Sequence, residues 1–325
     1  MTQLDLFGAA PAPGGRGVGP AAPAPELAAL AARLPRGVRL GTSSWSFPGW
    51  AGIVYDRAVS SATLARRGLA AYGRHPLLRT VGLDRTYYAP IAESDFAAYA
   101  AAVPADFRFL VKAPEALTTA RFPDHVRYGE QRGAPSAMFL DAGWATDAIC
   151  APMAGGLGEQ AGVLLFQFPP QPLGLLGGPA RFAERLHGFL DRLPRGLAYA
   201  VELRAEALFT PAYRQSLAAT GAVHAINVHP TMPPPAVQAA QLPDGDAVTV
   251  VRWMLGHGQR YEEARERYLP FDRLVDEDPT SRAEIAQLCR AAAARGREAY
   301  VVINNKAEGS APLSAVRLAA AIVDG

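Results

Sequence analysis

The chain has 325 residues, half of them hydrophobic, and a formal net charge of +2 at pH 7. This length suffices for one large barrel or two ordinary domains, and the small net charge argues against nucleic-acid binding by bulk electrostatics. No apolar run is long enough to span a bilayer, and the N-terminus lacks the basic-then-apolar order of a signal peptide. The two cysteines, Cys150 and Cys289, are far apart in sequence and fit a reducing compartment. We therefore expect a cytoplasmic protein that does not bind a membrane.

The first part of the chain, residues 1–36, is expected to be a disordered tail ahead of a folded domain over residues 37–325. Residues 8–25 are mainly Ala, Pro and Gly, and they offer too few large apolar side chains to form a core. A tail of this composition would act as a flexible tether.

Near the start of the tail, residues 3–7 read Gln-Leu-Asp-Leu-Phe. Leu4, Leu6 and Phe7 are costly to expose on a tether unless the groove of a partner covers them. The segment resembles the short peptide with which bacterial replication and repair proteins dock onto the DNA sliding clamp. That resemblance implies a hydrogen-bonded Gln3 and a Leu-Phe pair in an apolar pocket of the clamp. The alternative is a disordered start without a partner.

From Val38 onward, short apolar runs alternate with segments of helical spacing. The runs are rich in Val, Leu, Ile or Phe, as strands buried on both faces are. The predicted strands are 38–43, 80–84, 107–112, 162–168, 197–203, 223–228, 247–253 and 298–304. The predicted helices are 63–72, 94–103, 136–153, 180–193, 211–219, 281–295 and 311–323, whereas the Pro-rich connection 229–246 shows no clear helical pattern.

Eight strands in this alternation favour an α/β fold of the (β/α)8 TIM-barrel type. The alternative is a doubly wound open sheet, which would carry a glycine-rich phosphate loop between a strand and a helix. The glycine pairs at 14–15 and 177–178 do not lie in such a setting.

In a barrel, polar residues that follow the strands meet at the C-terminal face, where TIM-barrel enzymes carry their active sites. The predicted substrate-binding residues of this face are Ser43, Trp45, Tyr87, Tyr88, Gln167, Arg204, Arg252, Asn304 and Asn305. For Trp45 and Tyr88, stacking against a substrate competes with ordinary packing.

Lys112 and Glu202 are the predicted catalytic residues. Of the 32 Lys and Arg residues only Lys112 and Lys306 are lysine, and both follow predicted strands, where a compact, titratable ammonium has a use. Unremarkable surface lysines are the alternative. Glu202 and Arg204 alternate along one strand and share a face. They form either a structural ion pair or an acid/base group beside an anion clamp.

No metal site is predicted. The six histidines show no H-x-x-x-H or H-E-x-x-H spacing, and the two cysteines are isolated. A Mg²⁺ ion held by one or two carboxylates would leave little trace in the sequence, so the cofactor stays unidentified.

Several motifs, taken in chain order, resemble the YecE-like family, which is catalogued as a domain of unknown function. They lie at residues 41–50, 86–88, 107–114, 165–170, 201–204, 251–252 and 304–311. The resemblance runs from about Arg39 to the C-terminus and implies a TIM barrel without a settled activity. The chain departs from the family pattern at Gly82, Ala205, Met254 and Lys306, where polar positions are lost or changed. An altered substrate or a lost activity is therefore among the expectations.

Three functions remain open from the sequence. The leading hypothesis is a clamp-tethered enzyme of DNA processing or repair that acts on a phosphodiester or a modified nucleotide. In it, Lys112, Arg204 and Arg252 hold phosphate and Glu202 moves a proton. The second hypothesis is a metabolic barrel enzyme for a small phosphorylated or carboxylated compound. The third is a non-catalytic adaptor bound to the clamp.

Overall fold

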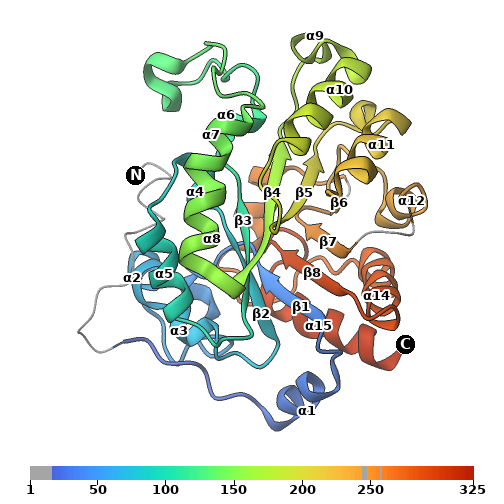
Figure 1. Cartoon of the computed structure of the whole chain (residues 1–325). Helices are drawn as coiled ribbons and strands as arrows, with labels where there is room; N and C mark the ends of the chain where they lie inside the picture. The colour runs from blue at the N-terminus through green and yellow to red at the C-terminus, as the bar shows by residue number, and fades with distance from the viewer. Residues whose placement is uncertain (1–16, 244–246, 257) are drawn as a thin grey trace.

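The structure is a computed structural model that describes residues 17–243, 247–256 and 258–325. Eight parallel strands close into a barrel in chain order, and helices surround it (Figure 1). The prediction of a (β/α)8 barrel is confirmed. The strands are β1 Val38–Thr42, β2 Leu78–Leu83, β3 Arg108–Lys112, β4 Ala161–Phe168, β5 Ala198–Leu203, β6 Val223–Val228, β7 Val248–Trp253 and β8 Glu298–Ile303.

Most helices lie in the connections between strands, as the alternation predicts. The α-helices are α1 Pro25–Arg33, α2 Ser61–Arg67, α3 Leu69–Tyr72, α4 Arg85–Tyr88, α5 Glu93–Ala101, α6 Glu115–Thr118, α7 Ala142–Ala145, α8 Ala151–Leu157, α9 Leu173–Leu176, α10 Gly178–Asp191, α11 Pro211–Thr220, α12 Pro235–Ala239, α13 Tyr261–Tyr268, α14 Pro279–Ala294 and α15 Ala311–Asp324. Shorter turns are η2 Pro48–Trp50, η3 Val126–Gln131, η4 Thr146–Cys150, η5 Gly158–Gln160 and η6 Glu206–Leu208.

The eight predicted strands match the observed ones to within two residues at each end. The helices differ more. Part of the segment expected to be a disordered tail forms α1, because its Ala31 and the following Leu34 are buried against the barrel's outer layer. Helix α13 was not predicted, and the predicted helix 136–153 is divided among α7, η4 and α8.

The barrel closes around a small apolar interior. Leu110, Leu165 and Ala200 belong to an interior cluster that is separate from the larger core between strands and helices. Neighbouring strand residues such as Val111 and Val201 point the other way, into that outer core. Strands such as β4 and β5 are therefore apolar on both faces, which explains the apolar runs in the sequence.

Gly41 allows β1 to approach β2 closely. The register between these strands shifts between Leu40 and Gly41. A Cβ atom added at Gly41 would lie 1.9 Å from the Thr80 carbonyl oxygen, so a larger residue would push the strands apart.

The chain before α1 is attached to the connection that follows β1. The Gly19 amide donates to Asp56 Oδ1 at 3.1 Å, and the Ala21 amide donates to the Val54 carbonyl at 2.9 Å. Connections of this kind lie toward the C-terminal side of a parallel barrel. In the described part of the chain, no helix combines the length and the apolar character needed to cross a membrane.

Candidate active site

Polar side chains replace apolar ones at the C-terminal end of the barrel interior. Leu110 lies in the interior apolar cluster, and Lys112, two residues later on β3, shares its face. Ala200 and Glu202 on β5 are related in the same way. By this alternation, the polar residues of what we call the mouth are Ser43, Asp84, Lys112, Gln167, Glu202, Asn227, Arg252 and Asn304, with Arg204 one step further out on β5.

Glu202 joins two arginines in a buried ion network. Arg204 donates from Nε to Glu202 Oε1 at 2.6 Å, and Arg252 Nε lies 3.3 Å from Glu202 Oε2. Glu202 and Arg252 are fully buried. Burial alone would raise the pKa of Glu202, but Arg204, Arg252 and Lys112 together outweigh it and hold that pKa below its usual range. The carboxylate is therefore ionised at neutral pH and engaged with two guanidinium groups.

Arg252 keeps unused hydrogen-bond donors in this network. Its Nε and Nη1 atoms are buried and make no hydrogen bond with a described residue, although Nε lies at ion-pair distance from Glu202. The register places Asn227 of β6 directly beside Arg252, and the Asn227 Oδ1 atom likewise lacks a partner among the described residues. Buried groups without partners are costly, and they accumulate at sites that a ligand completes.

Lys112 lies at the end of β3 with its ammonium over an aromatic ring. Its Nζ atom is 3.6 Å from the centre of the Tyr87 ring, and the residue is 8% exposed. Burial lowers the pKa of Lys112 to about 8, with Asp84 and Glu202 acting in the opposite direction and Arg252 and Arg204 adding to the decrease. An amine in this range carries a useful neutral fraction at physiological pH.

Lys306, the second lysine of the chain, lies on the same side of the barrel. Its Nζ atom donates to Asn304 Oδ1 at 3.2 Å and lies 4.1 Å from the centre of the Tyr261 ring. Asn304 also donates to Ser43 Oγ at 3.0 Å, which connects β8 to β1. Burial lowers the pKa of Lys306 to about 8. Both lysines singled out by their rarity are thus buried at the mouth, and neither is an ordinary surface lysine.

Aromatic residues border the mouth. Tyr88 packs edge-on against Tyr87 at 5.5 Å between ring centres. Burial raises the pKa of Tyr88 to about 12, and Asp84 adds to the increase. Tyr261 of α13 is close enough to Asp84 for that carboxylate to help raise its pKa, after burial. Tyr261 was not predicted, because it lies in a polar segment outside the predicted helices.

The carboxylate of Glu115, in the connection after β3, lies near Tyr87. Glu115 accepts from Arg127 Nη2 at 3.0 Å and from the Tyr128 hydroxyl at 2.7 Å. It also helps raise the pKa of Tyr87, after burial. Glu115 therefore links the ring beneath Lys112 to the segment around η3.

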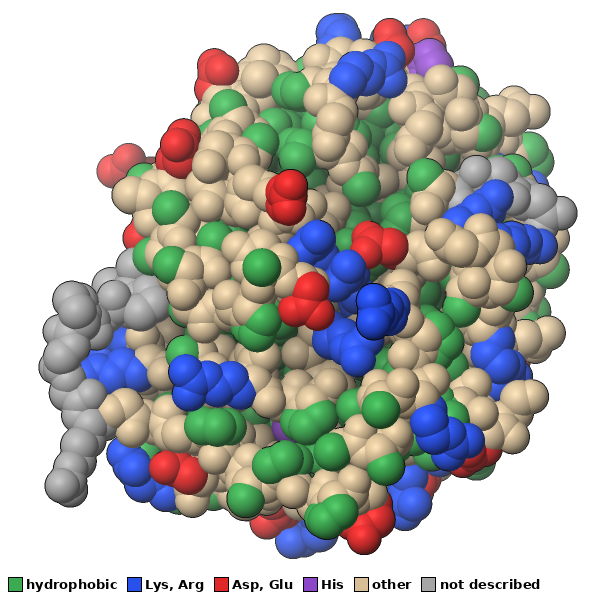
Figure 2. Space-filling view, turned by 60° about the horizontal axis from the view of Figure 1, so that its bottom comes forward, with side chains coloured by type: hydrophobic (Ala, Val, Ile, Leu, Met, Phe, Trp, Pro, Cys, Tyr) green, Lys and Arg blue, Asp and Glu red, His purple; other side chains and the backbone are tan. Residues whose placement is uncertain are grey.

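The charges of the mouth do not cancel. Lys112, Lys306, Arg204 and Arg252 face two carboxylates, Asp84 and Glu202, which leaves a surplus of two positive charges when all six groups are ionised. At the opposite end of the barrel, Arg39 donates to Glu298 Oε1 at 2.8 Å in a balanced pair. Figure 2 shows, on one face of the molecule, basic side chains gathered near the middle between acidic ones, rather than a continuous basic band across the described residues.

Two predicted substrate-binding residues make hydrogen bonds within the protein. Trp45 is buried, donates from its indole nitrogen to the Leu64 carbonyl at 3.0 Å and packs edge-on against Tyr99. Asn305 follows Asn304 by one residue and faces away from the interior, and its Oδ1 atom accepts from the Ala311 amide at 2.8 Å at the start of α15. In each residue one polar side-chain atom is engaged by the protein itself, whereas the Nδ2 atom of Asn305 has no partner among the described residues.

The remaining predicted site residues divide into two groups. Ser43, Tyr87, Tyr88, Gln167, Arg204, Arg252 and Asn304 lie around the mouth with Lys112 and Glu202. Gln3, Leu4, Leu6 and Phe7 lie outside the described residues. Within the described ranges, no group of three or more His, Cys, Asp or Glu side chains is arranged to hold a metal ion.

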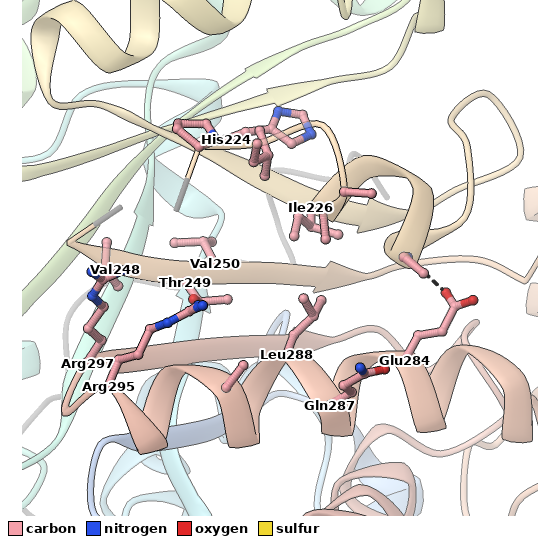
Figure 3. A pocket seen from close by; sticks show the side chains of 16 residues that line it. His224, Ile226, Val248, Thr249, Val250, Glu284, Gln287, Leu288, Arg295 and Arg297 are labelled. Atoms are coloured by element: carbon pink, nitrogen blue, oxygen red, sulfur yellow. Dashed lines mark hydrogen bonds between the residues drawn. The ribbon is translucent and has the colours of Figure 1, made fainter. Parts of the chain in front are cut away.

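A separate hollow of about 360 Å³ lies outside the barrel, between β6, β7, α12 and α14 (Figure 3). It arises because α12 has only five residues and covers little of the strands beneath it. Ile226 and Leu288 contribute apolar walls, and Glu284 accepts a hydrogen bond from the Ala236 amide at 3.1 Å. No predicted site residue lines this hollow, so it is distinct from the mouth.

Comparison with known proteins identifies a family. The family described as "Protein of unknown function DUF72" matches residues 39–324, so the chain belongs to it. No curated protein matches. A DUF72 family protein from Enterococcus faecalis superposes with a TM-score of 0.57 at 20% identity, covering 88% of this chain and 95% of its own. A DUF72 family protein from Thermotoga maritima gives 0.53 at 22% identity, covering 86% and 97%. These likenesses support the barrel fold.

Proposed function

We propose that this member of the DUF72 family is an enzyme that binds an anionic substrate group, a phosphate or a carboxylate, in the mouth and uses the amine of Lys112 in its chemistry. The observation that carries the proposal is a buried, desolvated amine beside a buried pair of arginines in a site with surplus positive charge. The C-terminal end of a TIM barrel is also where such enzymes act.

The arginine network supports the anion-binding part. Arg252 presents Nε and Nη1 without hydrogen bonds, and Arg204, at 9% exposure, forms the outer side of the same network. A planar guanidinium donates well to the paired oxygens of a phosphate or carboxylate. Glu202 holds both guanidinium groups in place through its two oxygens.

The proposal gives Glu202 a positioning role and Lys112 the reactive one. A carboxylate whose pKa is held low by three cations is a poor proton carrier near pH 7. Lys112, with a pKa of about 8, exchanges a proton readily in that range. Gln167, which pairs in register with Glu202, is placed to orient a substrate without competing for charge.

Thermal unfolding with added anions tests the proposal. Phosphate, pyruvate or a phosphorylated sugar should stabilise the wild type, by about 2.7 kcal/mol at a hundred times the Kd. The substitution Arg204→Gln should weaken this stabilisation about ten-fold or more in ligand concentration, since one charge-assisted hydrogen bond is lost. The matched control is Arg195→Gln, because Arg195 is an exposed partner of Asp191 in the connection before β5. Equal losses in both variants, or no stabilisation of the wild type, would overturn the proposal.

We further propose that residues 3–7 recruit the enzyme to the bacterial sliding clamp. The support is the match of Gln3, Leu4, Leu6 and Phe7 to the clamp-docking peptide. The attachment of residues 17–21 beside the connection after β1 is compatible with a tether that leaves from the side of the mouth. On this proposal the anionic group belongs to DNA or to a nucleotide fragment, and oligonucleotide and small-molecule probes distinguish the two.

A further inference from the structure

We propose that the substrate carries a carbonyl group, an aldehyde or ketone, and that Lys112 captures it as an imine. This inference rests on the proposed function and deepens it, because it names the functional group that the amine of Lys112 meets while the arginines hold the anionic group. The juxtaposition that carries it is the amine of a buried lysine, held over the Tyr87 ring, beside the surplus positive charge of the mouth and the unpartnered donors of Arg252.

The amine of Lys112 has no partner of its own in the described chain. It forms no ion pair within 4.0 Å and no hydrogen bond through Nζ with any described residue, and the Tyr87 ring lies against it. Lys306 differs, because its Nζ atom donates to Asn304 Oδ1. A lysine kept for structure usually pairs with a carboxylate or carbonyl, since burying an unpaired ammonium is expensive. A lysine that acts as a nucleophile needs a neutral Nζ atom without such a partner, so that its lone pair is desolvated and accessible to the substrate.

The backbone holds Lys112 firmly in this position. Thr86 donates from Oγ1 to the Lys112 carbonyl at 2.6 Å and to the Leu83 carbonyl at 2.9 Å, which joins the ends of β2 and β3. The register of these strands places Asp84 beside Lys112, and Asp84 Oδ1 is buried without a hydrogen bond to a described residue. An unused carboxylate oxygen is therefore within electrostatic reach of the amine, although the two groups form no ion pair.

These groups suffice for the steps of imine formation. Neutral Nζ forms a bond to the carbonyl carbon while the carbonyl π electrons move to oxygen, and proton transfer gives a neutral carbinolamine. Asp84, which first accepts the proton that leaves the Lys112 ammonium, then returns this proton to the hydroxyl, which leaves as water as the nitrogen lone pair forms the C=N bond. The net change is Lys112 ammonium plus carbonyl to protonated imine plus water, without an oxidant or reductant. A protonated imine keeps the positive charge of Lys112, and the carboxylates of Asp84 and Glu202 stabilise it.

Reductive trapping tests the proposal directly. The full chain is incubated with cyanoborohydride and one of four carbonyl probes, namely pyruvate, glyoxylate, glyceraldehyde 3-phosphate or 2-deoxyribose 5-phosphate, and then mapped by mass spectrometry. Because Lys112 and Lys306 are the only lysines, Lys306 and the N-terminal amine serve as internal comparisons. At least one probe should modify Lys112 saturably and about ten-fold faster than Lys306, which is what one charge-assisted contact of its anionic group contributes. The variant Lys112→Met should lose that adduct while its circular dichroism stays native.

The outcomes separate this inference from the proposed function. If anions stabilise the protein but none of the four probes modifies Lys112 faster than Lys306, the imine is wrong and anion binding stands. If anions fail to bind and no adduct forms, both fail. Suppression of the Lys112 adduct by inorganic phosphate would place the two events in one site and support both.

Discussion

Replacing Lys112 by Met should stabilise the protein at neutral pH and not above about pH 10.5. Burial lowers the pKa of Lys112 from 10.5 to about 8. Each unit corresponds to about 1.4 kcal/mol, so the charged amine costs the folded state about 3 kcal/mol. Methionine has a similar length and no charge, and it removes this cost. At active sites, replacing a reactive group often increases stability and lowers activity.

The sign of the pH dependence follows from proton binding. Below pH 8 the amine is protonated in both the folded and the unfolded chain, so the full cost is present. Between pH 8 and 10.5 the unfolded chain binds more protons than the folded chain, and the wild type gains stability as pH rises. Above 10.5 the amine is neutral in both states. The stability difference between Lys112→Met and wild type should therefore shrink by about 3 kcal/mol across this interval.

Urea unfolding of wild type, Lys112→Met and Arg195→Gln at several pH values between 6 and 10.5 measures this difference. Ionising tyrosines affect all three proteins alike and cancel in the comparison. The stability difference between Arg195→Gln and wild type should not change with pH in this range. Arg195 is exposed, and its replacement leaves the buried amine of Lys112 in place. A difference between Lys112→Met and wild type that stays constant over this range would refute the reasoning.

Two further predictions concern the network and the tail. Glu202→Gln leaves Arg204 and Arg252 without their counter-charge and should cost about 3–5 kcal/mol in urea unfolding, with part of the loss restored by sulfate. If sulfate stabilises Glu202→Gln no more than it stabilises the wild type, the result would count against an anion site at Arg204 and Arg252. A peptide of residues 1–12 should bind purified bacterial clamp, and replacing Leu6 and Phe7 by Ala should abolish binding in a polarisation assay. Undiminished binding of that double variant would exclude clamp docking through this pair.

The fold was predictable because its strands are short apolar runs that alternate with segments of helical spacing. The run at residues 162–166 is continuous and lies inside β4, and Pro169 follows directly after that strand. The same rule placed Lys112, Glu202 and Arg252 at one end of the barrel. Strand alternation and parallel topology determine that arrangement without any knowledge of tertiary packing.

Contacts between segments that are distant in the sequence were not predictable. Trp45 follows β1 directly, as a substrate-stacking residue would, but the Leu64 carbonyl of α2 accepts its only donor. Asn305 differs from Asn304 by one position, which is enough to turn it toward α15. Tyr261 reaches the mouth from α13, and no periodicity in the sequence indicates where a helix in a connection will lie.

Nuclear magnetic resonance of the lysine side chains tests the central claim most directly. With ¹³C-labelled lysine the spectrum contains only Lys112 and Lys306, and Lys112→Met assigns the two signals. The proposed site predicts a Lys112 pKa of about 8 that rises when phosphate or pyruvate is added, because a bound anion favours the charged amine. A Lys112 signal that titrates near 10.5 and does not respond to either anion would contradict an anion-binding site built around a reactive amine.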